Sequence, residues 1–222
     1  MPGIVGLITR IPRKCAEEKL AAMVGALRHE FSYITGTWSD EQSGVYCGWV
    51  ARAGSFSANM PLCDPSGEAV LIFSGEDYSR CASSAPMAVR SDGQDGPGYL
   101  LQRRHDDPAF PASLNGRFQG LLVDRPRGGA LLFNDRYGMH RVYYHESADA
   151  FYFAAEAKAI LAVCPELRRV DPRALLGAIG MRRSCESAMV QRGSTCPSTV
   201  ERSGWAMHAM GLFQSSTSRP RT

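Results

Sequence analysis

Two pairs of short apolar runs, each pair joined by turn residues, are the feature that most constrains the fold. The first pair is residues 118–124 and 130–134, joined by a turn rich in Pro and Gly. The second pair is residues 142–145 and 151–154, joined by a polar turn. Apolar runs arranged in this way are typical of β-hairpins. The pattern favours antiparallel sheets and makes a doubly wound parallel sheet a poor match.

The remaining periodic segments add a few helices and further strands. Leu20, Met23, Val24 and Leu27 recur at intervals of three and four, which predicts an amphipathic helix over residues 16–28. Further strands are expected over residues 3–8, 45–50 and 69–73, and further helices from Pro97 to Arg104, over 155–163 and over 171–179. Together these elements predict an α+β fold in which helices cover antiparallel sheets.

The composition changes abruptly near Gly180. Residues 181–222 hold six arginines and no lysine against two glutamates, so this segment carries +4 while the whole chain carries +3. The net charge of residues 1–180 is therefore −1, and a nucleic-acid partner, which needs a basic patch on the folded part, is not expected. Residues 181–222 are also rich in Ser and Thr and show no periodicity, which predicts a domain over 1–180 followed by a disordered, low-complexity tail.

Chain length and cysteine usage bear on the cellular setting. At 222 residues a compact fold buries about 70% of the unfolded surface, so neither a disulfide nor a metal is needed for folding. The seven cysteines form no C-x-x-C pair, and their odd number indicates reduced thiols. The apolar N-terminal residues precede the first basic ones, the reverse of a secretory signal, and no run approaches the roughly 20 apolar residues of a membrane helix. We expect a cytoplasmic protein without a membrane partner.

Four blocks of sequence resemble the N-terminal glutaminase domain of the glutamine-dependent asparagine synthetase family. Pro2–Gly6 is similar to that family's Cys-Gly-Ile-Ala-Gly, and Phe73–Tyr78 to its Phe-Asn-Gly-Glu-Ile-Tyr. Leu114–Phe118 and Asn134–Gly138 are similar to its Leu-Asn-Gly-Met-Phe and Arg-Asp-Arg-Leu-Gly. Phe153–Leu161 is similar to its Phe-Ala-Ser-Glu-Ile-Lys-Ala-Leu-Leu. The resemblance implies a class II glutamine amidotransferase of the N-terminal-nucleophile hydrolase type, folded as a four-layer αββα sandwich over residues 1–180.

The resemblance implies a cysteine nucleophile at position 2, which this chain lacks. In such glutaminases the N-terminal Cys thiolate attacks the side-chain amide of glutamine, and the α-amine of the same residue serves as base. Pro2 occupies that position and offers no side-chain nucleophile. The nearest cysteine, Cys15, follows the predicted first strand and a basic loop, so nothing in the sequence places it at the start of that strand.

The resemblance also implies oxyanion donors and substrate-binding residues. Ser74 and Gly75 align with the Asn side chain and Gly N–H that stabilise the tetrahedral oxyanion, although Ser is shorter than Asn. Glu76 and Asp92 fall where the family's acidic residues hold the α-amine of the substrate. Arg52 is the nearest candidate for the arginine that binds the α-carboxylate. The alternative is that Glu76 and Asp92 are ordinary solvated loop carboxylates.

Other conspicuous polar residues favour structural interpretations. Asp135, Arg136 and Gly138 are expected to form a turn with a buried ion pair. His140 and His145 are expected to be hydrogen-bonded surface histidines, not metal ligands. No Gly-rich nucleotide-binding loop of the G-x-x-x-x-G-K-[ST] or G-x-G-x-x-G type occurs, so no cofactor or metal is expected.

Three functions remain open from the sequence. The first is an asparagine synthetase-like amidotransferase domain without glutaminase activity, whose only expected ligand is glutamine. The second is a working glutaminase that supplies ammonia to a synthetase domain on another chain, and the third is a non-catalytic interaction or scaffold domain. The tail over residues 181–222 is either an out-of-frame or truncated remnant of a synthetase-encoding gene, or a disordered extension of a genuine stand-alone domain.

Overall fold

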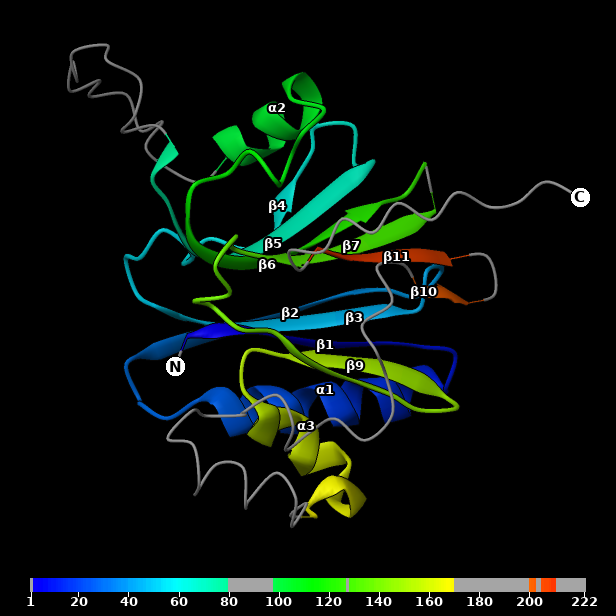
Figure 1. Ribbon diagram of the computed structural model, residues 1–222. Coiled ribbons are helices and arrows are strands. Elements are labelled where there is room, and N and C mark those ends of the chain that lie inside the picture. The colour runs from blue at the N-terminus through cyan, green and yellow to red at the C-terminus, as the bar shows by residue number, and fades with distance from the viewer. Residues whose placement is uncertain (1, 80–97, 127, 170–199, 203–204, 211–222) are drawn as a thin grey trace, which may run out of the picture.

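The computed structural model describes residues 2–79, 98–126, 128–169, 200–202 and 205–210. Its elements form four layers (Figure 1): one helix, a six-stranded sheet, a five-stranded sheet and two further helices. The five-stranded sheet has the order β2 (Tyr33–Asp40), β3 (Val45–Arg52), β1 (Gly3–Thr9), β9 (Ala150–Ala154) and β8 (Tyr143–Glu146). The six-stranded sheet has the order β10 (Val200–Arg202), β11 (Trp205–Met210), β7 (Gly129–Asn134), β6 (Gly116–Asp124), β5 (Ala69–Asp77) and β4 (Leu62–Cys63).

Both hairpins expected from the sequence are present. β6 and β7 pair antiparallel from Gln119–Asn134 to Asp124–Gly129, and the connecting turn is closed by Gly128 N–H donating to Arg125 O. β8 and β9 pair antiparallel from Tyr143–Ala154 to Glu146–Phe151. The α+β class and the αββα layers predicted from the sequence are therefore confirmed.

The five-stranded sheet is buried on both faces, which explains the continuous burial of its central strands. One face of β3 presents Val45, Cys47 and Trp49 to the space between the sheets, and the other face presents Tyr46 and Val50 to the helices. The helices on that outer side are α1 (Arg13–Leu27) and α3 (Ala157–Val163), followed by a short 3-10 helix over Pro165–Leu167. The buried residues of α1 are those that predicted it, Leu20, Met23, Val24 and Leu27, together with Ala16.

Helix α2 (Tyr99–Asp106) covers the outer face of the six-stranded sheet. Arg104 Nη2 lies 2.5 Å from Asp124 Oδ2, which fixes the helix to the end of β6. The fully buried side chain of Asp77, at the end of β5, accepts a hydrogen bond from Tyr99 Oη at 2.8 Å. Since Asp124 and Asp77 lie at opposite ends of the paired strands, these contacts attach α2 to both ends of the β5–β6 pair. The expected start of the helix at Pro97 lies outside the described residues.

Within residues 1–180, the strands β2 and β4 were not predicted from the sequence. β2 is an edge strand in which only Tyr33 is fully buried, so it lacks the apolar alternation that marks a half-buried strand. β4 consists of two residues. The described part of the chain contains no helix that is long and apolar enough to span a membrane.

Nine residues of the segment predicted to be a disordered, low-complexity tail are described, and they form the two strands β10 and β11. β10 and β11 pair antiparallel with each other, and β11 pairs parallel with β7 from Met207–Ala130 to Met210–Phe133. The physical reason is that the outer edge of β7 offers backbone groups to any extended segment that reaches it. The helix expected over residues 171–179 and the predicted boundary near Gly180 lie outside the described residues.

Candidate functional site

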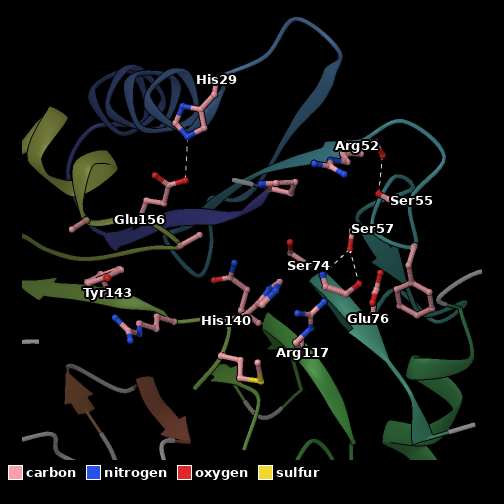
Figure 2. Close-up of a pocket in the computed structure, with 18 of the residues that line it drawn as sticks. His29, Arg52, Ser55, Ser57, Ser74, Glu76, Arg117, His140, Tyr143 and Glu156 are labelled. Atoms are coloured by element: carbon pink, nitrogen blue, oxygen red, sulfur yellow. Dashed lines mark hydrogen bonds and ion pairs between the residues drawn. The ribbon is translucent and has the colours of Figure 1, made fainter. Parts of the chain in front are cut away.

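A cavity of about 1060 Å³ opens where the start of β1 approaches the ends of β3 and β5. Figure 2 shows its labelled residues coming from both sheets, from the segment after α1 and from the start of α3. Five of the six site residues proposed from the sequence line this cavity, namely Pro2, Arg52, Ser74, Gly75 and Glu76. The sixth, Asp92, lies outside the described residues.

Side chains that point to one face of β5 and β6 form a polar wall of the cavity. Ser74 lies opposite Gln119 and Glu76 lies opposite Arg117 in the antiparallel register. Positions two apart along a strand share a face, so these four side chains point the same way, and all four line the cavity. We call these four residues the β5–β6 wall.

Gly75 lies in the middle of this wall, and its backbone geometry requires glycine. Its φ is +125°, and a Cβ built there would lie 2.1 Å from the backbone oxygen of Arg117. Its N–H donates a hydrogen bond to Ser57 Oγ at 3.0 Å, and Ser57 Oγ donates to Gly75 O at 3.3 Å. Ser57 and Ser74 are both almost completely buried. The N–H expected to serve as an oxyanion donor is therefore occupied by a neighbouring hydroxyl.

Pro2 lies at the edge of the cavity, directly before β1. Four cysteines belong to the described residues, Cys15, Cys47, Cys63 and Cys164; all are free and none lines the cavity. Burial raises the pKa of the Cys47 and Cys164 thiols, so both are neutral at pH 7. The described part of the chain thus places no thiolate at this site.

His140 lies above the β5–β6 wall and is uncharged at neutral pH. Burial lowers the pKa of its imidazole below the ordinary 6.5, and the charge on Arg117 lowers it further, whereas Asp135 and Glu76 oppose the shift. Arg117 and Glu76 both act on the pKa of His140 through their charges, so both side chains lie near its ring. His140, expected from the sequence to be a surface histidine, is half-buried and lines the cavity.

The segment that positions His140 is a turn organised by a buried carboxylate. Asp135 accepts hydrogen bonds from the backbone N–H groups of Tyr137 at 3.1 Å, Met139 at 2.9 Å and His140 at 2.7 Å. The turn was expected, but the buried ion pair was not found among the described residues. Three backbone donors satisfy the carboxylate instead, and Arg136 points to solvent.

His29, Glu156 and Lys158 form the opposite wall, which sequence reasoning missed. His29 Nε2 lies 3.1 Å from Glu156 Oε1 and 2.6 Å from Lys158 Nζ, while Lys158 Nζ lies 3.1 Å from Glu156 Oε2. Burial lowers the pKa of the Lys158 ammonium. We call these three residues the His29 cluster. His145 lies elsewhere, with its ring stacked on Tyr152 at a centroid distance of 6.3 Å. Among the described residues, no three His, Cys, Asp or Glu side chains are grouped so that they could hold a metal ion.

Comparisons with known proteins agree with this architecture. A family model described as a glutamine amidotransferase domain matches residues 1–193. The protein named Amidase chry2 from Gibberella zeae is 26% identical over 151 residues, which is 65% of this chain and 22% of that protein. The chain thus spans about a fifth of the length of this relative.

The solved structure of glutamine phosphoribosylpyrophosphate amidotransferase from B. subtilis, complexed with ADP and GMP, has a similar fold. The TM-score is 0.53 at 13% identity, and the match covers 73% of this chain and 43% of that one. This likeness shows a shared fold.

Proposed function

Because this chain belongs to the family of glutamine amidotransferase domains, we propose that it is an asparagine synthetase-like member that retains the ligand cavity but does not hydrolyse glutamine. The observation that carries the proposal is Pro2 at the edge of the cavity, at the position implied for the nucleophile, with no described cysteine beside it. Amide hydrolysis by this mechanism needs a thiolate and a base on one residue. Proline offers neither a thiol nor any other side-chain nucleophile.

The oxyanion position supports the same proposal. A tetrahedral intermediate needs donors aimed at its negative oxygen, and loss of one such donor costs about 10²- to 10³-fold in rate. Here the Gly75 N–H already donates to Ser57 Oγ at 3.0 Å, and Ser74 is buried. A nucleophile restored at position 2 would therefore still lack a prepared site for the developing charge.

Glutamate release from glutamine tests the proposal. We expect the purified chain to release no glutamate above the buffer rate. Pro2→Cys, with removal of Met1 verified by mass spectrometry, should remain weak, while Pro2→Cys combined with Ser57→Ala and Ser74→Asn should gain more than the single change. Turnover by the unaltered chain that Pro2→Ala abolishes would refute the proposal and support a working glutaminase that supplies ammonia to an asparagine synthetase-type ligase.

A second candidate function, a non-catalytic interaction or scaffold domain, is favoured by exposed apolar side chains near the cavity. Phe31 is 100% exposed, Tyr137 77% and Met139 60%. Phe31 follows His29 by two residues, and Met139 itself lines the cavity. Such side chains fit a protein partner that covers the cavity mouth, and a synthetase domain on another chain is one such partner. Sedimentation that shows a monomer, together with pull-downs that recover no partner through these residues, would rule this candidate out.

A further inference from the structure

We propose that the cavity is a binding site for a small acidic amino acid of the aspartate or glutamate class, in preference to glutamine. The inference rests on the proposed function only in that both use the same cavity. It is carried by the charge pattern of the described lining residues and by one buried amide oxygen that accepts no hydrogen bond from them.

The described lining residues include two arginines without a partner. Arg52 comes from the end of β3 and Arg117 from β6, so the two guanidinium groups approach the cavity from different sheets (Figure 2). Within the described residues, neither guanidinium makes an ion pair or a side-chain hydrogen bond. An unpaired guanidinium at a cavity is a ready partner for a carboxylate, which it can bind through two parallel hydrogen bonds.

The β5–β6 wall contributes one carboxylate to the cavity, that of Glu76. Glu76 is directly opposite Arg117 in the β5–β6 register, yet no ion pair within 4.0 Å joins them in the described part of the chain. One oxygen of Glu76 accepts a hydrogen bond from Tyr78 Oη at 2.6 Å, and the other is available to a cation. Arg52, Glu76 and Arg117 thus present a positive, a negative and a positive group to one space.

This pattern complements the charges of an acidic amino acid. At neutral pH such a ligand carries two carboxylates and one ammonium group, which match the two guanidinium groups and the Glu76 carboxylate. Glutamine carries only one carboxylate, and its neutral amide would leave one arginine unmatched. The remaining charged lining residues are Arg141 and the paired Lys158 and Glu156. His140 adds no charge at neutral pH because burial lowers its pKa.

Gln119 supplies an independent indication of a ligand. Its side chain is only 2% exposed, it lines the cavity, and its Oε1 accepts no hydrogen bond from the described residues. A buried oxygen without a partner is costly, and a ligand N–H would satisfy it. A Cβ placed on Gly3 would lie 2.8 Å from Gln119 Nε2, so this carboxamide reaches the start of β1 beside Pro2. The ammonium group of an amino acid can donate both to Gln119 Oε1 and to Glu76.

Calorimetric titration of the purified chain with L-glutamate, L-aspartate, L-glutamine and glutarate tests the inference. We expect one of the two acidic amino acids to bind about tenfold or more tightly than glutamine, because a charge-assisted contact to Arg117 is made only by the acid. Glutarate lacks the ammonium group and should bind more weakly than glutamate. Equal or tighter binding of glutamine, or no detectable binding of either acidic amino acid at millimolar concentration, would overturn the inference.

Arg117→Met is the decisive variant, and Arg168→Met is its matched control. Arg117 is exposed, so Met can keep the apolar stem while removing the charge without loss of folding, which circular dichroism verifies. The preference for the acidic amino acid over glutamine should fall about tenfold in Arg117→Met and stay unchanged in Arg168→Met, because Arg168 is exposed and does not line the cavity. An unchanged preference in Arg117→Met would contradict the assignment. Because binding is measured instead of glutamate release, this result is independent of whether glutamine is hydrolysed.

Discussion

The two walls of the cavity differ in how far their polar groups satisfy one another. In the His29 cluster, all three side chains lie within hydrogen-bond or ion-pair distance of each other. In the β5–β6 wall, Arg117 makes no ion pair with the described residues and Gln119 Oε1 has no hydrogen-bond partner there. The polar groups of the His29 cluster therefore pair with one another, whereas the described part of the β5–β6 wall leaves a guanidinium group and an amide oxygen available to a ligand.

The largest expected effect concerns the backbone of the β5–β6 wall. Gly75→Ala should lower the free energy of unfolding by about 3 kcal/mol, because φ at this position is +125° and the new Cβ would lie 2.1 Å from Arg117 O. Gly54→Ala is the control, since φ is +72° there but no atom lies within 4 Å of an added Cβ, and it should cost about 1 kcal/mol. Urea denaturation of both variants measures the difference. Equal losses of unfolding free energy in the two variants would mean that the close contact between Gly75 and Arg117 does not determine the backbone geometry of the β5–β6 wall.

Gln119→Leu should stabilise the ligand-free chain by about 1 kcal/mol. The substitution removes a buried oxygen that has no hydrogen-bond partner among the described residues and replaces it with an apolar group of similar size. The same change should weaken binding of the acidic amino acid. Thermal unfolding with and without ligand measures both effects, and Gln102→Leu on the exposed face of α2 serves as control. Destabilisation of the ligand-free chain would indicate that the Gln119 amide is already satisfied.

His29→Ala should have a smaller effect on stability, about 0.5 kcal/mol, because the His29 cluster is partly exposed to solvent. Ligand affinity should stay unchanged if the side chains of this cluster pair with one another and do not contact the ligand. His105→Ala, which removes another exposed histidine beside a carboxylate, should leave both quantities unaltered. A loss of ligand affinity in His29→Ala alone would show that the two walls act together.

The smallest expected effect is the pH dependence contributed by His140. Burial lowers its pKa in the folded chain, so between that value and 6.5 the unfolded chain binds more protons. Its contribution to stability is therefore complete above pH 6.5 and declines as the pH falls through this range. His140→Gln should make the acid side of the stability profile shallower. Urea midpoints measured between neutral and mildly acidic pH check this, and a steeper profile in the variant would show that the sign is wrong.

Local patterns were sufficient to predict most of the fold. The apolar spacing of α1 and the apolar runs of both hairpins depend on neighbours in the sequence, and the structure confirms them. β2 escaped prediction because it is an edge strand with mostly exposed side chains. β11 was missed because it pairs with the edge of β7, more than 70 residues away in the sequence. The periodicity of a short segment gives no information about such a distant partner.

The site was predictable where the resemblance named its residues and unpredictable where tertiary contact created it. Pro2 and Glu76 were proposed from short motifs and Arg52 as the nearest candidate arginine, and all three line one cavity. Arg117 belongs to one of the same motifs. Its position opposite Glu76 depends on the register between β5 and β6, which the sequence does not show because a long segment separates the two strands. The contact between His29 and Lys158 joins residues 129 positions apart.

We propose that this cavity binds an amino acid without cleaving an amide. The most direct measurement follows L-glutamine, isotope-labelled at its side-chain nitrogen, by NMR during incubation with a large amount of the purified chain. We expect the amide signal to persist and no labelled ammonium to form beyond the rate in buffer. Formation of labelled ammonium in excess of the protein, abolished by Pro2→Ala, would contradict the proposal.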